Sequence, residues 1–202
     1  MAKKIKHIHG RPKKSARVLS RAMIIETSFY LANEVGFENL SMKSIAIKLE
    51  IRPPSIYNHV SDIMEIKLGV ARLTLDRLAE YLKDSVESKS AETNDKIKIL
   101  KSLFTSYREF AKKYSGVYSA VLPSAENNPE MQTSSKELIE ICMKSLGISG
   151  NLDSKAIHKI RILRSTLHGF VSLEAAGGFG LPESVDETFE ILADHLVSNL
   201  LN

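Results

Sequence analysis

Residues 41–59 read SMKSIAIKLEIRPPSIYNH, and this stretch decides the fold because it describes two short helices joined by a tight turn. Ser41 suits the N-cap of the first helix. Three apolar residues then recur at helical spacing: Ile45, Ala46 and Leu49. Ile51 brings an apolar side chain into the turn, and the prolines at 53 and 54 suit the start of the second helix, where the ring costs no hydrogen bond. The stretch predicts a helix-turn-helix.

Polar side chains gather at the start and outer edge of the predicted second helix, while Ile56 can face the first helix. A helix that enters the major groove of DNA needs donors there. We expect Arg52, Ser55 and Asn58 to meet base edges. Four residues are expected to contact phosphates: Ser41, Lys43, Tyr57 and His59. Taken alone, the motif also fits a surface hairpin whose polar face is merely solvated.

The positive charge of the chain is concentrated in its first third. Residues 1–67 carry 12 Lys and Arg against 6 Asp and Glu, whereas residues 68–202 carry 16 against 18. Residues 1–22 contain no acidic residue. Such a segment repels itself and cannot form a core, so we predict that the arm of residues 1–17 is disordered until a polyanion neutralises it.

The tripeptide at residues 10–12, Gly-Arg-Pro, resembles the core of an AT-hook. In that motif an extended arginine, here Arg11, reaches into the narrow minor groove of A/T-rich DNA. A solubilising tail is the alternative. Attraction to a membrane surface is weaker, because the arm has no amphipathic apolar face.

Composition limits the class of protein. The content of 43% hydrophobic and 26% charged residues is ordinary for a globular chain, and no run of 18 apolar residues predicts a membrane span. The basic N-terminus lacks the apolar segment of a signal peptide. Cys142 is the only cysteine, so no internal disulfide can form. We expect a cytoplasmic protein with no membrane partner.

The remaining pattern predicts an all-α protein of about nine helices, because no strand alternation is found. Outside the motif the expected helices cover residues 18–35, 62–85, from 94 or 95 through 110, 130–146, 153–176 and 184–200, with loops at 88–95 and 124–129. Asp62 and Glu65, three residues apart, suit a capping box at the start of the second of these helices, and Asp153 suits the N-cap of the fifth. Residues expected on the inner faces of the second and third of these helices are Leu68, Leu75, Leu78, Leu82, Ile97, Leu100, Phe104, Tyr107 and Phe110.

No pattern typical of catalysis is found. The chain lacks a glycine-rich phosphate loop, HExxH, CxxC and a nucleophile elbow, and the glycines at 177–180 follow no strand. His7 and His9 are too few for a metal site. We therefore expect no catalytic residue, metal or cofactor. A small-molecule enzyme that uses His168 as a base is a distant alternative.

The motif and its surroundings resemble the TetR family of bacterial transcription regulators. The resemblance covers residues 24–70 and is most specific at Gly36-Phe37, Ile45-Ala46 and the Tyr-x-His-like triplet at 57–59. Residues 163–182 are similar to the effector-binding WHG domain. Four positions depart from the family pattern: Glu50, Arg52, Val60 and Ile63.

The resemblance implies a three-helix DNA-binding domain at residues 18–66, after the arm, and a helical effector-binding and dimerisation domain at 67–202. The residues expected to line its ligand cavity are Phe104, Tyr107, Tyr118, Cys142, Met143, Leu163 and His168, although each also fits a core position. The residues expected in a four-helix interface between two copies are Leu167, Gly169, Phe170, Phe189, Leu192 and Leu196, and burial within one chain would explain them too.

These expectations describe a homodimeric regulator, most simply a ligand-responsive repressor on a palindromic operator. Its partners would be double-stranded DNA and an unknown small-molecule effector. The alternative is an architectural protein that coats A/T-rich DNA with its basic arm and makes no choice of operator.

Overall fold

The computed structural model describes residues 19–121 and 129–201, and all regular structure in these two ranges is helical. The all-α prediction is confirmed, with eight α-helices in the described residues where about nine were expected. Their bounds are α1 Arg21–Val35, α2 Met42–Lys48, α3 Pro53–Ile56, α4 Ile63–Glu92, α5 Lys96–Lys113, α6 Pro129–Ser145, α7 Ser154–Ala175 and α8 Val185–Leu201, with short 3₁₀ helices at Phe37–Asn39 and Tyr118–Val121. None of the described helices is both long and apolar enough to cross a bilayer. The predicted arm, with Arg11, lies outside the described residues.

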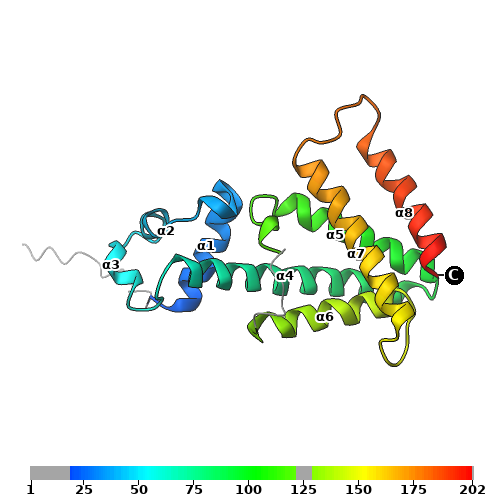
Figure 1. The fold of residues 1–202 in the computed structure, drawn as a ribbon, viewed down its shortest axis with the longest axis horizontal. Helices are drawn as coiled ribbons and strands as arrows, with labels where there is room; N and C mark the ends of the chain where they lie inside the picture. Colours follow the sequence, from blue (N-terminus) through cyan, green and yellow to red (C-terminus); the bar gives the residue numbers. More distant parts are fainter. Residues whose placement is uncertain (1–18, 122–128, 202) are drawn as a thin grey trace, which may run out of the picture.

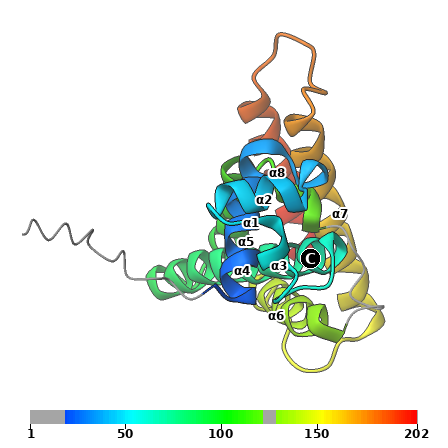
Figure 2. The same cartoon turned by 90° about the vertical axis from the view of Figure 1, so that its left-hand side faces the viewer.

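Helix α4 runs along the long axis of the molecule and belongs to both of its ends (Figure 1). Helices α1–α3 gather around its first turns, and we call this part the head. Helices α5 and α6 pack along the rest of α4, α7 and α8 pack on α5, and we call this part the body. Figure 2 views the molecule from the head. The expected end of this helix near residue 85 is wrong, since α4 continues to Glu92, and the loop expected at 88–95 is confirmed only for residues 93–95. The polar run contains no glycine or proline that would end the helix earlier.

The buried side chains of the head form one end of a hydrophobic core that continues into the body. The largest fully buried side chains of the head are Ile24, Phe29, Ile45, Ile56 and Ile66. They come from α1, α2, α3 and the first turn of α4, so the apolar stripes of four helices meet at one place. Because the first turn of α4 is part of this end of the core, a movement of α4 carries the head with it.

The core of the body lies between α4, α5, α7 and α8, where Leu78, Phe104, Leu163 and Phe189 are almost inaccessible. Two inward predictions are wrong, because Leu68 on α4 and Ile97 on α5 are exposed. The buried residues of α4 are Ile66, Gly69, Val70, Ala71, Thr74, Leu75, Leu78, Ala79, Leu82 and Val86. With 3.6 residues per turn, two positions correspond to a rotation of about 200° around the helix. Residue 68 therefore lies on the side of α4 opposite to the buried residues 66 and 70.

A second joint connects head and body at Gly116, in the turn after α5. The amide of Gly116 donates to Asn33 Oδ1 (3.2 Å), and its carbonyl accepts from the amide of Phe37 (2.8 Å). Asn33 Nδ2 in turn donates to the carbonyl of Lys113 (3.2 Å). A Cβ at residue 116 would lie 2.4 Å from the backbone oxygen of Asn33, so this close approach requires glycine.

Candidate nucleic-acid interface and ligand cavity

The first helix of the motif begins with a reciprocal cap. The amide of Ser44 donates to Ser41 Oγ, and the amide of Ser41 donates to Ser44 Oγ, both at 3.1 Å. This confirms Ser41 as the N-cap and satisfies two donors that the helix itself leaves free. The Ser41 hydroxyl therefore already has a structural role in the head.

The turn of the motif closes in a left-handed conformation at Glu50, whose φ is 57°. Glycine is favoured there, because an L-residue brings its Cβ close to the backbone. The amide of Ile51 then donates to the carbonyl of Ala46 (3.0 Å), which brings the chain back across the end of α2. The departure from the family pattern at residue 50 thus falls at the one non-glycine position with a positive φ among the described residues.

The second helix begins as predicted, with both prolines in its first turn and Arg52 at the N-cap. It is short, and its last residue Ile56 is completely buried. The amides of His59 and Val60 donate to the carbonyl of Ile56 at 2.9 and 3.2 Å and continue the turn. Buried Ile56 and Val60 anchor the segment from below, so its other side faces outward.

Six of the predicted DNA contacts are at least partly accessible. Lys43, Arg52, Tyr57 and Asn58 are exposed, while Ser55 and His59 are half-buried. Within the described part of the chain, the functional groups of these six side chains have no intramolecular ion pair or hydrogen bond. The donors are therefore free to bind an external partner.

Other basic residues of the head already have carboxylate partners. Lys48 lies 2.7 Å from Glu34, and Lys67 lies 2.7 Å from Glu38.

Sequence reasoning missed Ile47 and Met64, two exposed apolar residues of the head. Apolar side chains are usually expected to be buried. For Ile47, the helical periodicity of Ile45 and Ala46 is the signal that could have predicted an exposed position.

The start of α4 is fixed to the start of α1 through Glu65. The amide of Glu65 donates to the N-cap Asp62 (2.9 Å), and its carboxylate accepts from Arg21 Nε (2.7 Å) and from the amide of Ser61 (2.8 Å). These hydrogen bonds, first of all the one from Arg21, lower the pKa of Glu65 to about 2. The Asp62–Glu65 cap predicted from the sequence is present, with Ser61 as the partner of the Glu65 side chain.

The body contains a partly open cavity of about 590 Å³ between α4, α5, α6 and α7. Its wall is mainly aliphatic. The lining residues are Leu75, Leu78, Leu82, Leu103, Tyr107, Val121, Ser135, Leu138, Ile139, Cys142, Leu152, Ile157, Ile160, Arg161, Leu163, Arg164 and Leu167. This volume and lining suit a small molecule with an apolar body.

The structure brings only part of the predicted ligand set to this cavity. Tyr107, Cys142 and Leu163 line it, whereas Phe104 is a fully buried core residue and Met143 packs against the core. Burial raises the pKa of the Cys142 thiol to about 12, so the thiol stays protonated. Arg161 and Arg164 were missed, although residues 154–173 contain four basic residues and no acidic one, a signal the sequence does offer.

Tyr118 and His168 do not line the cavity. They are connected to the lining residue Tyr107 by a chain of hydrogen-bonded side chains. The hydroxyl oxygens of Tyr107 and Tyr118 are 2.8 Å apart, and Tyr118 Oη lies 2.8 Å from His168 Nδ1. His168 Nε2 is 3.3 Å from Ser172 Oγ. Burial lowers the pKa of His168 and favours the neutral ring. His168 is therefore a histidine with partners on both nitrogens, outside the cavity wall.

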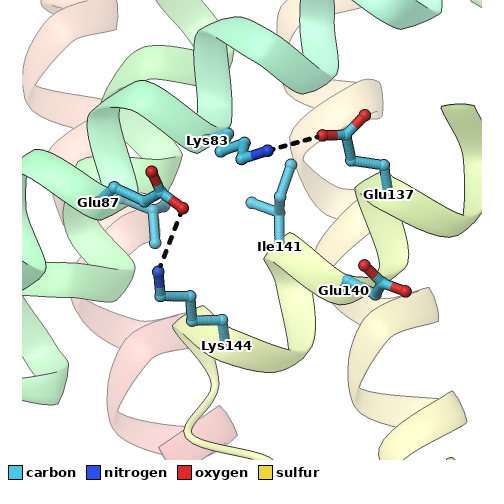
Figure 3. A pocket seen from close by; sticks show the side chains of 7 residues that line it. Lys83, Glu87, Glu137, Glu140, Ile141 and Lys144 are labelled. Atoms are coloured by element: carbon cyan, nitrogen blue, oxygen red, sulfur yellow. Dashed lines mark hydrogen bonds and ion pairs between the residues drawn. The ribbon is translucent and has the colours of Figure 1, made fainter.

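Helix α6 forms one wall of the cavity and is held on α4 by side chains that Figure 3 shows. Lys83 of α4 lies 3.2 Å from Glu137 of α6, and Lys144 of α6 lies 3.5 Å from Glu87 of α4. Between these two ion pairs, Ile141 lines a second, smaller pocket of about 150 Å³. Exposed pairs of this kind contribute little each, about 0–1 kcal/mol, so apolar packing holds most of the wall.

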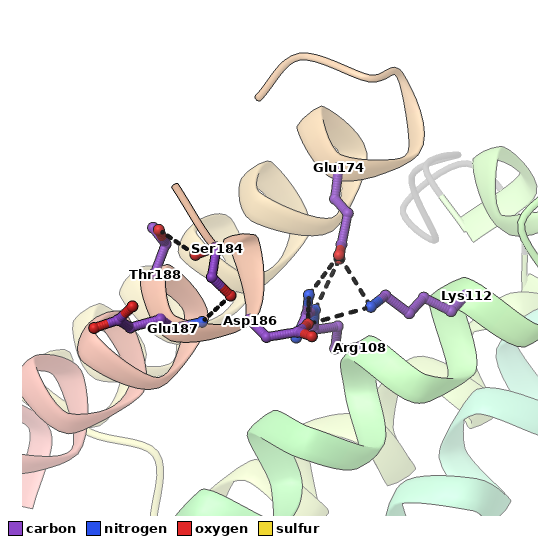
Figure 4. Close-up of polar contacts among 7 residues, drawn as sticks. All are labelled: Arg108, Lys112, Glu174, Ser184, Asp186, Glu187 and Thr188. Carbon is purple, nitrogen blue, oxygen red and sulfur yellow. Dashed lines mark hydrogen bonds and ion pairs between the residues drawn. The ribbon is translucent and has the colours of Figure 1, made fainter. Parts of the chain in front are cut away.

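Arg108 of α5 joins α7 and α8 (Figure 4). Its Nε donates to Glu174 (2.8 Å) and its Nη2 to Asp186 (2.6 Å), while Lys112 lies 3.0 Å from Glu174. The guanidinium also lies 4.7 Å from the ring centre of Phe189. The hydrogen bond from Arg108 lowers the pKa of the Glu174 carboxyl. This cluster fixes the C-terminal end of α7 and the N-terminal end of α8 to α5.

The predicted dimer residues divide into two groups. Leu167, Phe170 and Phe189 are exposed by only 1%, 7% and 2%, so they belong to the core of their own chain, which corrects the prediction. Gly169, Leu192 and Leu196 remain partly accessible, and a Cβ at Gly169 would meet no atom of the chain within 4 Å.

The apolar residues left outside on these helices are Ile162, Leu173 and Ile191, with 47%, 52% and 54% of their surface exposed. On α7, Ile162, Gly169 and Leu173 lie 7 and 4 residues apart, which places them on one side of the helix. The residues expected in the interface came from both this outer side and the inner side of the two helices. Only the inner side packs within the chain.

A helix-turn-helix head, a long connecting helix and a helical body with an apolar cavity together define a helix-turn-helix transcription regulator. Residues 100–196 match the family model described as "Tetracyclin repressor-like, C-terminal domain". The chain is 29% identical over 184 residues to the "Uncharacterized HTH-type transcriptional regulator YobS" of Bacillus subtilis (strain 168), over 91% of this chain and 93% of that protein. Residues 100–196 are therefore similar to a tetracycline-repressor-like C-terminal domain, and the relatives matched over most of the chain are named as helix-turn-helix transcription regulators.

Solved structures agree with the fold. A TetR-family transcriptional regulator from Streptomyces coelicolor superposes with a TM-score of 0.63 at 18% identity, over 90% of this chain and 99% of that one. A TetR variant from Acinetobacter baumannii AYE, solved in complex with minocycline, gives 0.63 at 21% identity, over 90% and 96%. At these identities the likeness extends to the fold, and the WHG designation stays a prediction.

Proposed function

We propose that the protein is a ligand-responsive repressor that binds a palindromic operator as a homodimer in the cytoplasm. One observation carries the proposal: the wall of the body cavity includes Leu75, Leu78 and Leu82 of α4, the helix whose first turn is built into the buried part of the head. A ligand in the cavity therefore touches the element that positions the head. In this proposal residues 18–66 bind DNA and residues 67–202 bind the effector and the second copy.

The path from cavity to head consists of packed contacts along α4. A Cβ at Gly69 would lie 2.6 Å from Ile25 Cδ1, so α1 and α4 pack closely at this point. Arg77 of α4 lies 3.1 Å from Glu26 of α1. An effector shifts the position of the head only if it binds the two arrangements with different affinity. The proposal requires that the DNA-bound arrangement has the weaker affinity for the effector.

The dimer is proposed to form through the outer sides of α7 and α8, where Ile162, Gly169, Leu173 and Ile191 are accessible. Gly169 permits close approach of two helix backbones. A single α3 contacts few bases, whereas two heads spaced by about 34 Å read two half-sites of an inverted repeat. This pairing gives the short recognition helix its operator specificity.

On DNA, Arg52, Ser55 and Asn58 are proposed to read base edges. The residues proposed to contact phosphates are Ser41, Lys43, Tyr57 and His59. The support is the outward position of the edge, the free donors on it and the anchoring of Ile56 below it. Arg11 would add a minor-groove contact from the arm.

The test is selection of DNA fragments by the full-length protein from a random pool, followed by sequencing. An inverted repeat with half-sites about one helical turn apart is expected. Enrichment of A/T-rich fragments without a repeat, unchanged by Arg52→Ala together with Asn58→Ala, would instead favour the architectural alternative. The comparisons do not favour that alternative, since the relatives are named as helix-turn-helix transcription regulators.

A further inference from the structure

We infer that the body cavity takes an anionic amphiphile, a small molecule with one negatively charged head group on an apolar body, and that Arg161 and Arg164 bind the head group. The inference rests on the proposed ligand-responsive function and names the chemical class of its ligand.

The two arginines are neighbours in the cavity wall. They lie three residues apart on α7, so their side chains leave the same face of the helix. Among the lining residues they are the only ones with a charged side chain, and no carboxylate lines the cavity within the described residues. An anion at this position meets two cations and no repelling group.

Neither arginine has an ion-pair partner within residues 19–121 and 129–201. Three other basic residues of the body, Lys83, Arg108 and Lys144, each pair with a carboxylate. A guanidinium presents a planar set of donors that matches a carboxylate or a phosphate. The two side chains therefore keep their strongest hydrogen-bonding capacity for something outside the chain.

The alternative is that both arginines are solvated surface residues with no ligand. Arg161 and Arg164 are exposed, yet the charge of Arg164 acts on groups of the cavity wall. It opposes the rise in the pKa of Tyr107 and of Cys142, both of which line the cavity. The charge of Arg164 is thus close to the interior and not directed only at bulk water.

The charge of α7 itself supports this assignment. Residues 154–173 hold four basic residues and no acidic one. Of these, Lys159 donates to the carbonyl of Leu200, which fixes it to α8 and away from the cavity. The two arginines therefore give this side of the cavity a positive potential that no neighbour on the same stretch of helix reduces.

The rest of the wall specifies the body of the ligand. Leucine, isoleucine and valine dominate it, and the space of about 590 Å³ holds a molecule larger than a simple inorganic anion. A neutral apolar ligand would leave the guanidinium groups with water alone as a partner, and a cation would be repelled. A molecule with a charge at each end would place its second charge against the aliphatic part of the wall, where that charge loses its hydration without compensation. One anionic end on an apolar body satisfies the whole wall.

Two fluorescent probes with the same aromatic body test the inference on the full-length protein, which has no tryptophan to interfere. 1-Anilinonaphthalene-8-sulfonate carries a negative charge, and N-phenyl-1-naphthylamine lacks it. We expect the anionic probe to bind at least tenfold more tightly. The double change Arg161→Gln, Arg164→Gln should remove about tenfold or more of its affinity and leave the neutral probe unchanged, because only charge-assisted hydrogen bonds are lost.

Two control variants locate the effect. Lys155→Gln removes a positive charge from the same helix outside the cavity lining and should change neither probe. Ser135→Phe should fill the cavity and weaken both probes without adding a tryptophan. Circular dichroism establishes that each variant is folded. Competition with sodium decanoate, decyl phosphate and methyl decanoate then compares head groups, and the two anions should displace the probe while the ester should not compete at the same concentration.

Equal affinity for the two probes, or an anionic preference that survives the double change, would overturn the inference. Operator binding measured with the same anions separates it from the proposed function. If the anions bind through the two arginines but leave operator binding unchanged, the ligand class stands and the proposed response to the ligand fails. If the protein selects an operator from the random pool but shows no preference for anionic probes, the proposed operator binding stands and the inference about the ligand class fails.

Discussion

Glu50 and Glu65 show how far single residues could be predicted. The sequence identified residue 50 as a departure from the family pattern, but the φ of 57° there is a property of the closed turn and only the structure shows it. For Glu65 the spacing from Asp62 predicted a cap. Its partner Arg21 lies 44 residues away in the sequence, and no local pattern indicates such a contact.

The cap at Glu65 gives a prediction about pH. The pKa of Glu65 is lowered from 4.5 to about 2, so its carboxylate stabilises the fold above pH 4.5, and this contribution is lost as the pH falls towards 2. Glu65→Gln should lower the free energy of unfolding at pH 7 by about 1 kcal/mol, since solvent screens the pair with Arg21. Urea denaturation at several pH values measures this, and the difference from the unaltered protein should shrink below pH 4.

A matched control for that prediction is Glu109→Gln, because the carboxylate of Glu109 accepts a hydrogen bond from the Tyr81 hydroxyl and has no ion-pair partner among the described residues. The account of the cap is contradicted if Glu65→Gln keeps its full deficit in stability at the lowest pH at which the protein still folds.

At the scale of elements, the joint at Gly116 gives the second prediction. Gly116→Ala should lower the free energy of unfolding by about 1–3 kcal/mol, because the new Cβ would meet the backbone of α1 and not a side chain that can rotate away. The control is Gly180→Ala, where the added Cβ meets no atom within 4 Å. Urea denaturation of both variants checks this, and similar stability of the two would remove the joint from the account.

Helix α7 shows why element faces were predicted only in part. The bounds of the helix and its N-cap Asp153 were predicted correctly, because a cap and a glycine stop are local signals. Which of two apolar sides packs inward is decided by neighbouring helices. Leu167 and Phe170 therefore lie in the core of the chain, and Leu173 lies outside.

The outer side of α7 gives the third prediction, which concerns assembly. Leu173→Glu together with Ile191→Glu should convert a dimer into a monomer, since both side chains are already exposed in one chain and burying two carboxylates in an interface is costly. Sedimentation velocity measures the change, and circular dichroism should show an unchanged helical content. Leu181→Glu, at an exposed residue between α7 and α8, is the control. A dimer that tolerates the double change would refute this interface.

At the scale of the whole molecule, sequence reasoning predicted the fold and the outward edge of the motif, because both depend on local periodicity and capping. It predicted the cavity poorly. Leu75, Leu78 and Leu82 look like ordinary core residues in the sequence, and they line a cavity only because α6 and α7 leave space beside them. That space depends on how four helices pack, which no single helix pattern records.

The central claim is that the exposed edge at the start of α3 reads bases while Lys43 binds phosphate. The measurement is the affinity of Lys43→Ala and Arg52→Ala for the selected operator and for single-base variants of it, across a range of salt concentrations. Lys43→Ala should weaken all sequences alike and reduce the salt slope by about 1, whereas Arg52→Ala should lose about 1–3 kcal/mol of discrimination at one base pair. Equal losses on every sequence for both variants would contradict the claim.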